Sequence, residues 1–526
     1  MNETADGAGS SKAGVEGGHV PEWIILALAC VAQFMVVLDV SIVNVALPSI
    51  GRDLHYSPTG LQWVVNAYVL TFAGFLLLGG RAADLFGRRR VYVFGLALFT
   101  LASLAGGIAQ NSAWLTAARA VQGIGGAVLS PATLTIIVTT FSGARMARAL
   151  GIWSATAGAG GAVGSVLGGV LTAEISWRWV LFVNIPIGVV AVVIALWYLT
   201  ELRREPRAEA RSLDFGGSIT VTAGLAALIY AIVGTDTHAW GSSYTLGVLG
   251  AAAVLLAVFV LIELKFVTRP LVPFRLFRSR SVTGANGVML LVGAAFFSMW
   301  YFLSLYMQNV LGFSALRTGL AFLPMALAIV IGAQVSSRAL PATGVRPLLL
   351  VGTVMAFGGF LWLSRIQAHS SYIGHVFGPG CLIAAALGVL FTPLASAATA
   401  EVSYTEAGLA SGVLNTSRQV GGSIGLAVLA TVAVDRTHVV LARSHDGTIP
   451  TGHATAIALT ARYARAFVIA ALLIATALVC SLVVPSLRSS PRRHSGSERE
   501  TEADPHEAHS APLPRGAGTA WEPEPA

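Results

Sequence analysis

Continuous apolar runs of about 20 residues recur along the whole chain, separated by short segments rich in Gly, Pro and charged residues. A helix of this length crosses a hydrocarbon layer of roughly 30 Å, because each helical residue advances about 1.5 Å. Strands of a transmembrane barrel would instead alternate apolar and polar residues. The pattern predicts fourteen membrane-spanning helices, at about 22–48, 61–80, 91–110, 114–137, 150–172, 179–199, 215–234, 245–266, 283–307, 316–337, 347–364, 374–399, 408–434 and 465–486.

The composition also indicates an all-α polytopic membrane protein. Of the 526 residues, 55% are hydrophobic and 11% are charged, and the mean hydropathy is +0.73. An average soluble domain has roughly 25% charged residues. The net charge of +8 does not indicate nucleic-acid binding, because the basic residues are scattered through the connections. The three cysteines lie far apart within apolar runs, so neither a metal site nor a cofactor is expected.

The distribution of Arg and Lys predicts the orientation in the membrane. The connections after even-numbered helices hold 17 basic residues and those after odd-numbered helices hold 8. Because basic connections stay on the cytoplasmic side, both termini are expected in the cytoplasm. The polar tails, 1–20 and 487–526, are expected to be disordered.

An internal repeat appears at an offset of 257 residues. RAADLFGRRRVYVFG after the second helix aligns with RALPATGVRPLLLVG after the tenth, and Gly164 and Gly168 align with Gly421 and Gly425. The same offset aligns two separate places in the chain, so the sequence predicts two parallel six-helix halves, 21–200 and 281–486. The segment 201–280 then holds two inserted helices and their connections. At this offset Asp39 corresponds to Phe296, so its carboxylate is confined to the first half.

Two ionisable residues lie within predicted membrane helices. Asp39 lies in the apolar run MVVLDVSIVNVALP, about 24 Å of helix beyond Trp23. Arg119 shares one face of the fourth helix with Gln122 and Gly126. Ionisable groups are costly in a membrane and indicate function, so Arg119 either faces the bundle interior or extends to the membrane surface.

Several long motifs occur in order: LDVSIVNVALP from residue 38, QWVVNAYVLTFAGFLLLGGRAADLFGRRR from 62, RAVQGIGGA from 119, GGAVGSVLGGVL from 160, WRWVLFVNIPIG from 177 and SGVLNTSRQVGGSIG from 411. With them, the chain resembles the major facilitator superfamily, in particular its fourteen-span drug:proton antiporters, from about residue 22 to 486. The resemblance implies the major-facilitator fold, two six-helix halves plus two inserted helices. It also implies that Asp39 carries the proton and that Arg119 lies beside it.

The connection after the second helix contains Gly80, Asp84, Gly87, Arg88 and Arg89. Its glycines permit a sharp turn, and its acid can face a helix N-terminus or an arginine. A solvated basic turn explains these residues as well. The resemblance implies a latch that holds the two halves together as the transporter changes state, although Leu85 stands where the family usually has a base.

The fifth helix carries a stripe of small residues that includes Gly160, Gly164, Gly168 and Gly169. A spacing of four residues lets another helix approach closely, and close packing alone is a sufficient explanation. The resemblance implies the glycine motif typical of antiporters, with Ser165 replacing the usual proline.

A substrate is expected between the halves near the midplane. The candidate lining residues are aromatic or amide-bearing with few fixed charges, namely Trp63, Asn66, Tyr68, Gln122, Trp300, Tyr306, Gln308, Asn415 and Arg418. For the Trp and Tyr residues, a place in the interfacial aromatic belt is the alternative. Such a cavity suits hydrophobic or cationic compounds.

The sequence therefore predicts a bacterial inner-membrane exporter of hydrophobic or cationic small molecules, driven by inward proton flow and acting as a monomer. A proton-coupled transporter of a siderophore, lipid or biosynthetic product remains an alternative, as does a channel. An enzyme is not expected. The Gly-x-Ser-x-Gly pattern at 421–425 lies within an apolar helix with no preceding strand, and neither lysine has the context of a phosphate-binding loop.

Overall fold

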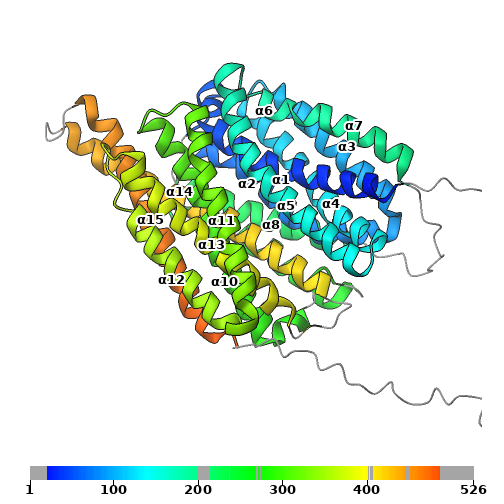
Figure 1. Ribbon diagram of the computed structural model, residues 1–526. Coiled ribbons are helices and arrows are strands. Elements are labelled where there is room, and N and C mark those ends of the chain that lie inside the picture. Colours follow the sequence, from blue (N-terminus) through cyan, green and yellow to red (C-terminus); the bar gives the residue numbers. More distant parts are fainter. Residues whose placement is uncertain are drawn as a thin grey trace, which may run out of the picture. The chain divides into compact units, whose positions relative to one another are not determined.

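The computed structural model describes residues 21–57, 59–199, 214–235, 237–267, 270–272, 274–400, 402, 407–445 and 451–485. All regular secondary structure in these ranges is helical (Figure 1). The chain divides into two units, Met1–Arg488 and Ser489–Ala526, and every described residue belongs to the first. The two tails predicted to be disordered, 1–20 and 487–526, lie outside the described residues.

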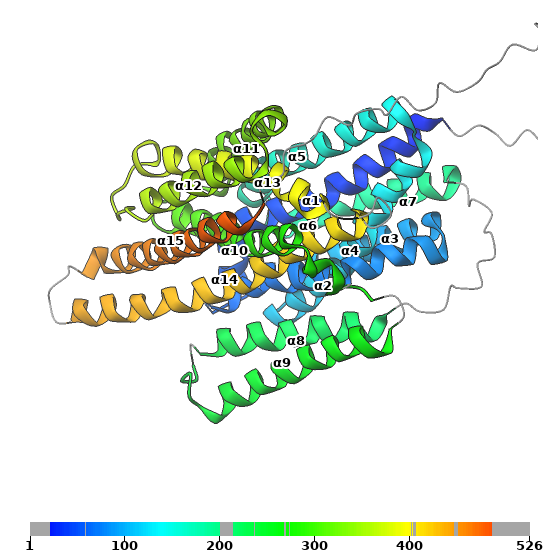
Figure 2. The same ribbon diagram turned by 90° about the horizontal axis from the view of Figure 1, so that it is seen from below.

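The helices of the first half follow one another with short connections. They are α1 (Glu22–Asp53), η1 (Gly60–Gln62), α2 (Trp63–Phe86), α3 (Arg88–Gly107), α4 (Ser112–Thr140), α5 (Gly143–Glu174), α6 (Trp179–Phe182) and α7 (Asn184–Tyr198). The inserted helices are α8 (Phe215–Gly234) and α9 (Ser243–Leu261), which continues as the π-helical turn η2 (Ile262–Phe266). Figure 2 shows α8 and α9 side by side, next to α2.

The second half begins after the short helix η3 (Phe274–Arg278). Its helices are α10 (Arg280–Asn309), α11 (Ala315–Thr343), α12 (Val345–Leu363), η4 (Ile373–Phe377), α13 (Gly378–Thr399), α14 (Ala407–His445) and α15 (Thr451–Val483). Thirteen helical segments of the described residues, which leave out α14, are long and apolar enough to cross a membrane. The predicted all-α class and the fourteen-helix order are confirmed.

Several helices extend beyond their predicted boundaries. The segment 435–464 was expected to be a long connection, but α14 continues to His445 and α15 already begins at Thr451. Apolar runs mark only the part of a helix that lies in hydrocarbon, whereas backbone hydrogen bonds continue a helix into polar sequence. For the same reason α1 does not end at Pro48 but runs on to Asp53.

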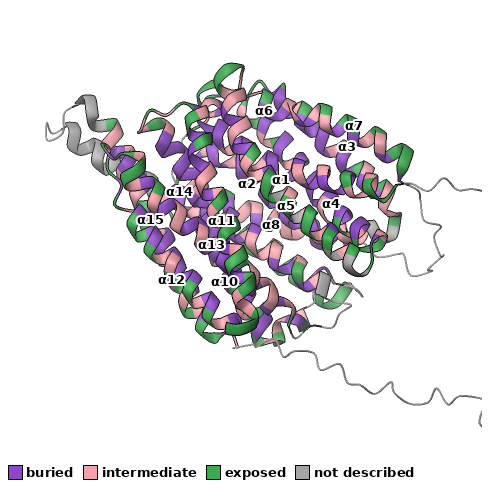
Figure 3. Cartoon of the chain, viewed as in Figure 1, coloured by how far each residue is buried: buried purple, intermediate pink, exposed green. Residues whose placement is uncertain are grey.

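The helices of the two halves pair in the same way. Within the first half α1 packs on α5, α2 on α4, and α3 on both α4 and α7; the second half repeats these pairs as α10 with α14, α11 with α13, and α12 with α13 and α15. The halves meet through α1 and α10, α2 and α14, and α5 and α11. Buried residues gather where helices face one another (Figure 3).

The repeat is also visible in the backbone of one turn. Gly87, between α2 and α3, has φ +91°, and Gly344, between α11 and α12, has φ +80°. Side chains other than glycine rarely adopt this left-handed region. These two glycines align at the predicted offset, so the same sharp turn joins the second and third helices of each half.

Candidate functional site

Asp39 and Arg119 form an ion pair inside the first half. Asp39 comes from α1 and Arg119 from the early turns of α4. The distance from Arg119 Nη1 to Asp39 Oδ2 is 2.5 Å, and the two side chains are 2% and 0% exposed. Arg119 therefore faces the bundle interior, and its alternative position at the membrane surface is excluded.

The guanidinium of Arg119 is fixed by three further contacts. Its Nε donates to the backbone oxygen of Val64 in α2 at 3.0 Å, and its Nη1 donates to Gln122 Oε1, one turn along α4, at 2.7 Å. Its Cζ lies 4.4 Å from the ring centroid of Tyr68, in cation–π geometry. The charge is thus held in one orientation by α1, α2 and α4.

The second oxygen of the Asp39 carboxylate accepts two amide hydrogen bonds. Gln122 Nε2 donates to Asp39 Oδ1 at 2.8 Å, and Asn184 Nδ2, from the first residue of α7, donates to it at 3.2 Å. The same two amides reach Ser103 Oγ of α3, at 3.1 and 3.0 Å, and Ser103 donates to the backbone oxygen of Leu181. Charge-assisted hydrogen bonds on both oxygens fit an ionised carboxylate.

We call Asp39, Ser103, Arg119, Gln122 and Asn184 the polar site. Sequence reasoning found Asp39, Arg119 and Gln122 but missed Ser103 and Asn184. Asn184 lies in the motif WRWVLFVNIPIG, which offered a signal, since an amide among apolar residues is unusual in a membrane helix. Nothing comparable marks Ser103, because serine is common in membrane helices.

The glycine stripe of α5 packs directly on the helix that carries Asp39. A Cβ at Gly160, Gly164 or Gly168 would lie 2.8 to 2.9 Å from the backbone oxygens of Phe34, Leu38 and Ile42 respectively. Such distances are too short for a side chain, so glycine is required for this approach of α5 to α1. Gly169 faces another way, where its Cβ would meet Leu316 of α11 in the second half at 2.6 Å.

The matching stripe of α14 packs on α10. A Cβ at Gly421 would lie 2.0 Å from the backbone oxygen of Leu290, and one at Gly425 would lie 2.4 Å from Ala294. Leu38 and Ile42 therefore correspond by contact to Leu290 and Ala294, an offset of 252 residues rather than 257. In this register Asp39 matches Leu291 and not Phe296. Either counterpart is apolar, so the carboxylate is still confined to the first half.

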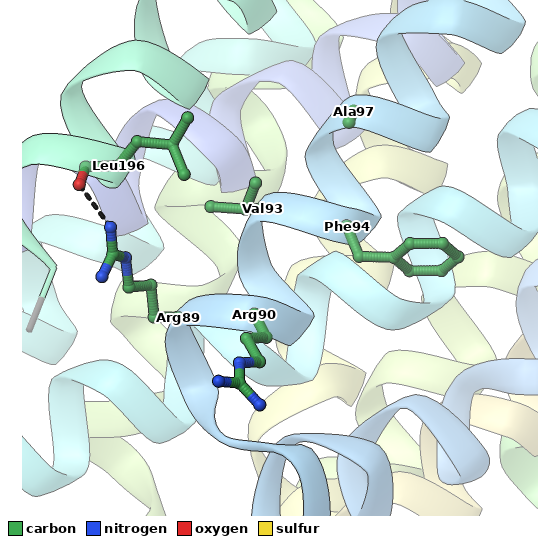
Figure 4. Close-up of a pocket in the computed structure, with 6 residues that line it drawn as sticks. All are labelled: Arg89, Arg90, Val93, Phe94, Ala97 and Leu196. Carbon is green, nitrogen blue, oxygen red and sulfur yellow. Dashed lines mark hydrogen bonds between the residues drawn. The ribbon is translucent and has the colours of Figure 1, made fainter. Parts of the chain in front are cut away.

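The predicted latch residues lie around the turn at Gly87. Arg88 begins α3, and a guanidinium nitrogen of Arg89 donates to the backbone oxygen of Leu196 near the end of α7, within the same half (Figure 4). A Cβ at Gly80 would be 3.7 Å from Pro131, an ordinary contact. The side chain of Asp84 lies outside the described residues. The latch therefore stays a prediction.

Gln308, expected in the substrate cavity, bridges the two halves. Its Nε2 donates to the backbone oxygen of Val45 in α1 at 2.9 Å, and Ser304 Oγ donates to that of Asn44 at 2.8 Å. Pro48 has no N–H to offer the oxygen of Asn44 four residues earlier. Ser304 satisfies this oxygen from α10, so the proline in α1 creates an acceptor that the second half uses.

The other predicted cavity residues are distributed over several contacts. Tyr68 and Gln122 belong to the surroundings of Arg119. Trp63 lies 6.4 Å from the ring of Tyr230 in α8, and Asn66 donates to Gln62. In the second half, Trp300 packs on Phe322, Tyr306 donates to the backbone oxygen of Gln367, and Asn415 accepts from Arg418, which lies over Phe391.

These observations define a class of protein. A charged, hydrogen-bonded cluster is buried between membrane-spanning helices of one half, and that half packs against a repeated second half. Among the described residues no group of three His, Cys, Asp or Glu side chains could hold a metal ion. Such an arrangement is that of a membrane transporter built from two halves.

The chain belongs to the Major Facilitator Superfamily, whose family model matches residues 29–426. It is 45% identical over 426 residues to the cephamycin export protein CmcT of Amycolatopsis lactamdurans, covering 81% of this chain and 87% of that protein. It is 37% identical to the puromycin resistance protein pur8 of Streptomyces alboniger, covering 94% and 97%. The chain is therefore a multi-pass membrane transporter and not an enzyme.

The fold is similar to that of a solved structure. A bacterial homolog of the human lysosomal transporter Spinster, in an inward-facing and occupied conformation, superposes with a TM-score of 0.62 at 16% sequence identity. The likeness covers 89% of this chain and 98% of the other.

Proposed function

We propose that this protein exports hydrophobic or cationic small molecules, of the antibiotic class, in exchange for protons that flow inward. The printed functions of its relatives, cephamycin export and puromycin resistance, support the export of such compounds. The observation that carries the coupling is the buried pair of Asp39 and Arg119, since a membrane-buried carboxylate with a defined partner is the arrangement a proton carrier needs.

In this mechanism Asp39 alternates between two states. When it is ionised, it accepts hydrogen bonds from Arg119, Gln122 and Asn184. A proton on Asp39 removes the negative charge and leaves the Arg119 guanidinium without its counter-ion. Helices α1 and α4 then lose the ion pair that joins them. The glycine face of α5 has no side chains in the way, so α1 can shift along it. Protonation would thus favour a different packing of the first half.

The two halves, 21–200 and 281–486, would alternate access to a site between them. Separation of α1 from α10 breaks the bonds that Gln308 and Ser304 make to the backbone of α1, each worth about 1 kcal/mol. Asp84 and the arginines after Gly87, at the C-terminal end of α2, would act as the latch that holds the halves together.

We further propose that the predicted lining residues contact the substrate and that the protein acts as a monomer. The membrane would be the bacterial inner membrane, with both termini on the cytoplasmic side.

The test is substrate-dependent proton movement in sealed proteoliposomes. Purified protein is reconstituted with a pH-sensitive dye inside, and a cephamycin, puromycin and lipophilic cations are added in turn. The proposal predicts that at least one compound changes the internal pH and is itself driven uphill by an imposed pH gradient. Uphill transport of only other metabolites would support the alternative substrate class. Conductance without any substrate competition would contradict the exporter.

A further inference from the structure

Arg418 of α14 forms no ion pair with any carboxylate of the described residues. Its Nη2 donates to Asn415 Oδ1, one turn earlier on the same helix, at 2.8 Å. Its Nε is buried and has no hydrogen-bond acceptor in the described part of the chain. Arg119, by contrast, has its charge balanced by Asp39. A charge held among membrane helices without a counter-ion is costly and indicates a functional site.

The second half offers Arg418 little choice of counter-ion. Its acidic residues all lie outside α10 to α13, namely Glu401, Glu406, Asp435 and Asp446. The first two precede α14, which begins 11 residues before Arg418. Asp435 follows 17 residues after it, about 25 Å further along the helix. The second-half helices around Arg418 therefore provide no carboxylate to balance its charge.

The side chain of Arg418 lies on the side of α14 that faces away from the inserted helices. Val420 and Ile424 of α14 pack in the apolar cluster formed with α8. Arg418 is about 200° from Val420 around the helix, because each residue turns an α-helix by about 100°. Its Cζ lies 5.4 Å from the ring centroid of Phe391 in α13. The guanidinium is therefore directed toward α13.

The surroundings of this guanidinium are open to a ligand. Phe391 is 43% exposed, and Arg418 and Asn415 are half-buried. Within the described residues, Arg418 Nη1 makes no hydrogen bond, and Asn415 Nδ2 makes none either. Unused N–H donors of a planar guanidinium match the two oxygens of a carboxylate, and charge-assisted hydrogen bonds of this kind are strong. The exposed ring of Phe391 offers apolar surface beside them.

We propose that Arg418 and Asn415 form a subsite that binds the carboxylate of the exported compound, with the ring of Phe391 against its hydrophobic body. This inference rests on the proposed export function and narrows its substrates to hydrophobic compounds that carry a carboxylate. Arg418 is the one charged residue among the proposed lining residues, so a cationic compound meets a like charge there. A bound carboxylate supplies the counter-ion that the second-half helices lack.

Equilibrium binding to the full-length protein in lipid nanodiscs tests this subsite. Three fluorescent probes share one hydrophobic body and differ in charge: pyrenebutyrate, pyrenebutyramide and pyrenebutylammonium. The wild type is expected to bind the carboxylate about tenfold more tightly than the amide, because only the carboxylate forms charge-assisted hydrogen bonds with Arg418. It should bind the ammonium probe no better than the amide. Equal affinity for the carboxylate and the amide overturns the proposal.

Substitutions of Arg418 locate the preference. Arg418→Gln should bind pyrenebutyrate and pyrenebutyramide equally, with the affinity for the amide as in the wild type, which also shows that the variant is folded. Arg418→Lys keeps the charge and should retain part of the preference. The matched control is Arg317→Gln, since Arg317 is exposed and also lies over a ring, 4.0 Å from the centroid of Phe313. A carboxylate preference that survives in Arg418→Gln contradicts the subsite.

A lipid headgroup is another source of an anion. The preference for pyrenebutyrate should be the same in nanodiscs of phosphatidylcholine and in nanodiscs that also contain phosphatidylglycerol. Its loss with the anionic lipid would assign Arg418 to a headgroup and overturn the substrate subsite. These measurements record binding and not transport. Their failure would therefore leave proton-coupled export standing, and export is judged separately by the proteoliposome assay.

Discussion

The two halves share one fold but use opposite chemistry at corresponding places. Asp39 corresponds to Leu291 in the register of the glycine contacts, and Ser103 and Arg119 correspond to Phe360 and Val376 at the offset of 257 residues. Phe360 and Val376 are buried, Leu291 packs against the same core, and the ring of Phe360 packs edge to face on that of Phe296 at 5.8 Å. The fold therefore needs neither a charge nor an amide at this place. The polar site is an addition to the scaffold of the first half, and this points to function.

The largest expected effect is that of Asp39→Asn, which keeps the shape of the polar site and removes its titratable group. Uphill export is expected to fall to background, measured as substrate efflux from cells that contain normal amounts of the protein. The matched control is Asp53→Asn on the same helix, which removes the exposed charge that pairs with Arg178 and keeps an oxygen that can accept from Trp177; loss of the pair costs about 0–1 kcal/mol. Efflux by Asp39→Asn equal to that of Asp53→Asn would remove Asp39 from the mechanism.

Arg119→Leu tests whether the polar half depends on pairing. It leaves the Asp39 carboxylate buried without its counter-ion, so the free energy of unfolding should fall by about 3–5 kcal/mol. Thermal unfolding in detergent measures this loss. The double variant Asp39→Asn with Arg119→Leu should regain most of the stability while remaining inactive in export. Absence of this rescue would mean that Arg119 acts through packing alone.

The converse variant in the apolar half is Phe360→Ala. It removes the ring that packs on Phe296 and leaves a cavity, with an expected cost of about 3–5 kcal/mol. Phe360 has no charged partner, so no second substitution should restore the lost stability as it does for the charge pair. Phe360→Leu should cost less than Phe360→Ala, because leucine fills more of the cavity. The same thermal unfolding series would show this, and equal losses for Leu and Ala would contradict a packing role.

The glycine stripes allow a finer comparison. A Cβ at Gly421 would lie 2.0 Å from Leu290 O, and one at Gly164 would lie 2.8 Å from Leu38 O. Both Ala variants should lose about 1–3 kcal/mol through overpacking, with the larger loss for Gly421→Ala. Gly158→Ala, where nothing lies within 4 Å, should lose none. Only Gly164→Ala is expected to alter the proton dependence of export, because its neighbour adjoins Asp39.

The smallest expected effect concerns the contact between the halves. Gln308→Ala removes one hydrogen bond to α1 and should shift the balance between conformations by about 1 kcal/mol. Cysteine accessibility on the two ends of α10 would report this shift, with Gln334→Ala, which changes an exposed side chain of α11, as control. A change in thermal stability without a change in accessibility would place Gln308 in the scaffold.

Much of the fold could be predicted because hydrocarbon thickness imposes one length on every span. The helix ends that lie in polar sequence could not be predicted, as the extensions of α14 and α15 show. The repeat offset also failed in one place. The glycine contacts align α1 with α10 at 252 residues, whereas the turns at Gly87 and Gly344 align at 257. A single offset cannot follow both, because 49 residues lead from Leu38 to Gly87 and 54 lead from Leu290 to Gly344.

The sequence by itself determined the membrane class, the order of helices, the two-half repeat and the presence of one carboxylate and one arginine in the first half. Each of these follows from local composition or from a motif. Only the tertiary structure decided that Asn184 and Ser103 join the site of Asp39, and that Ser304 uses the acceptor freed by Pro48. These partners are distant in the chain, and a single polar residue in an apolar helix does not specify which neighbour will satisfy it.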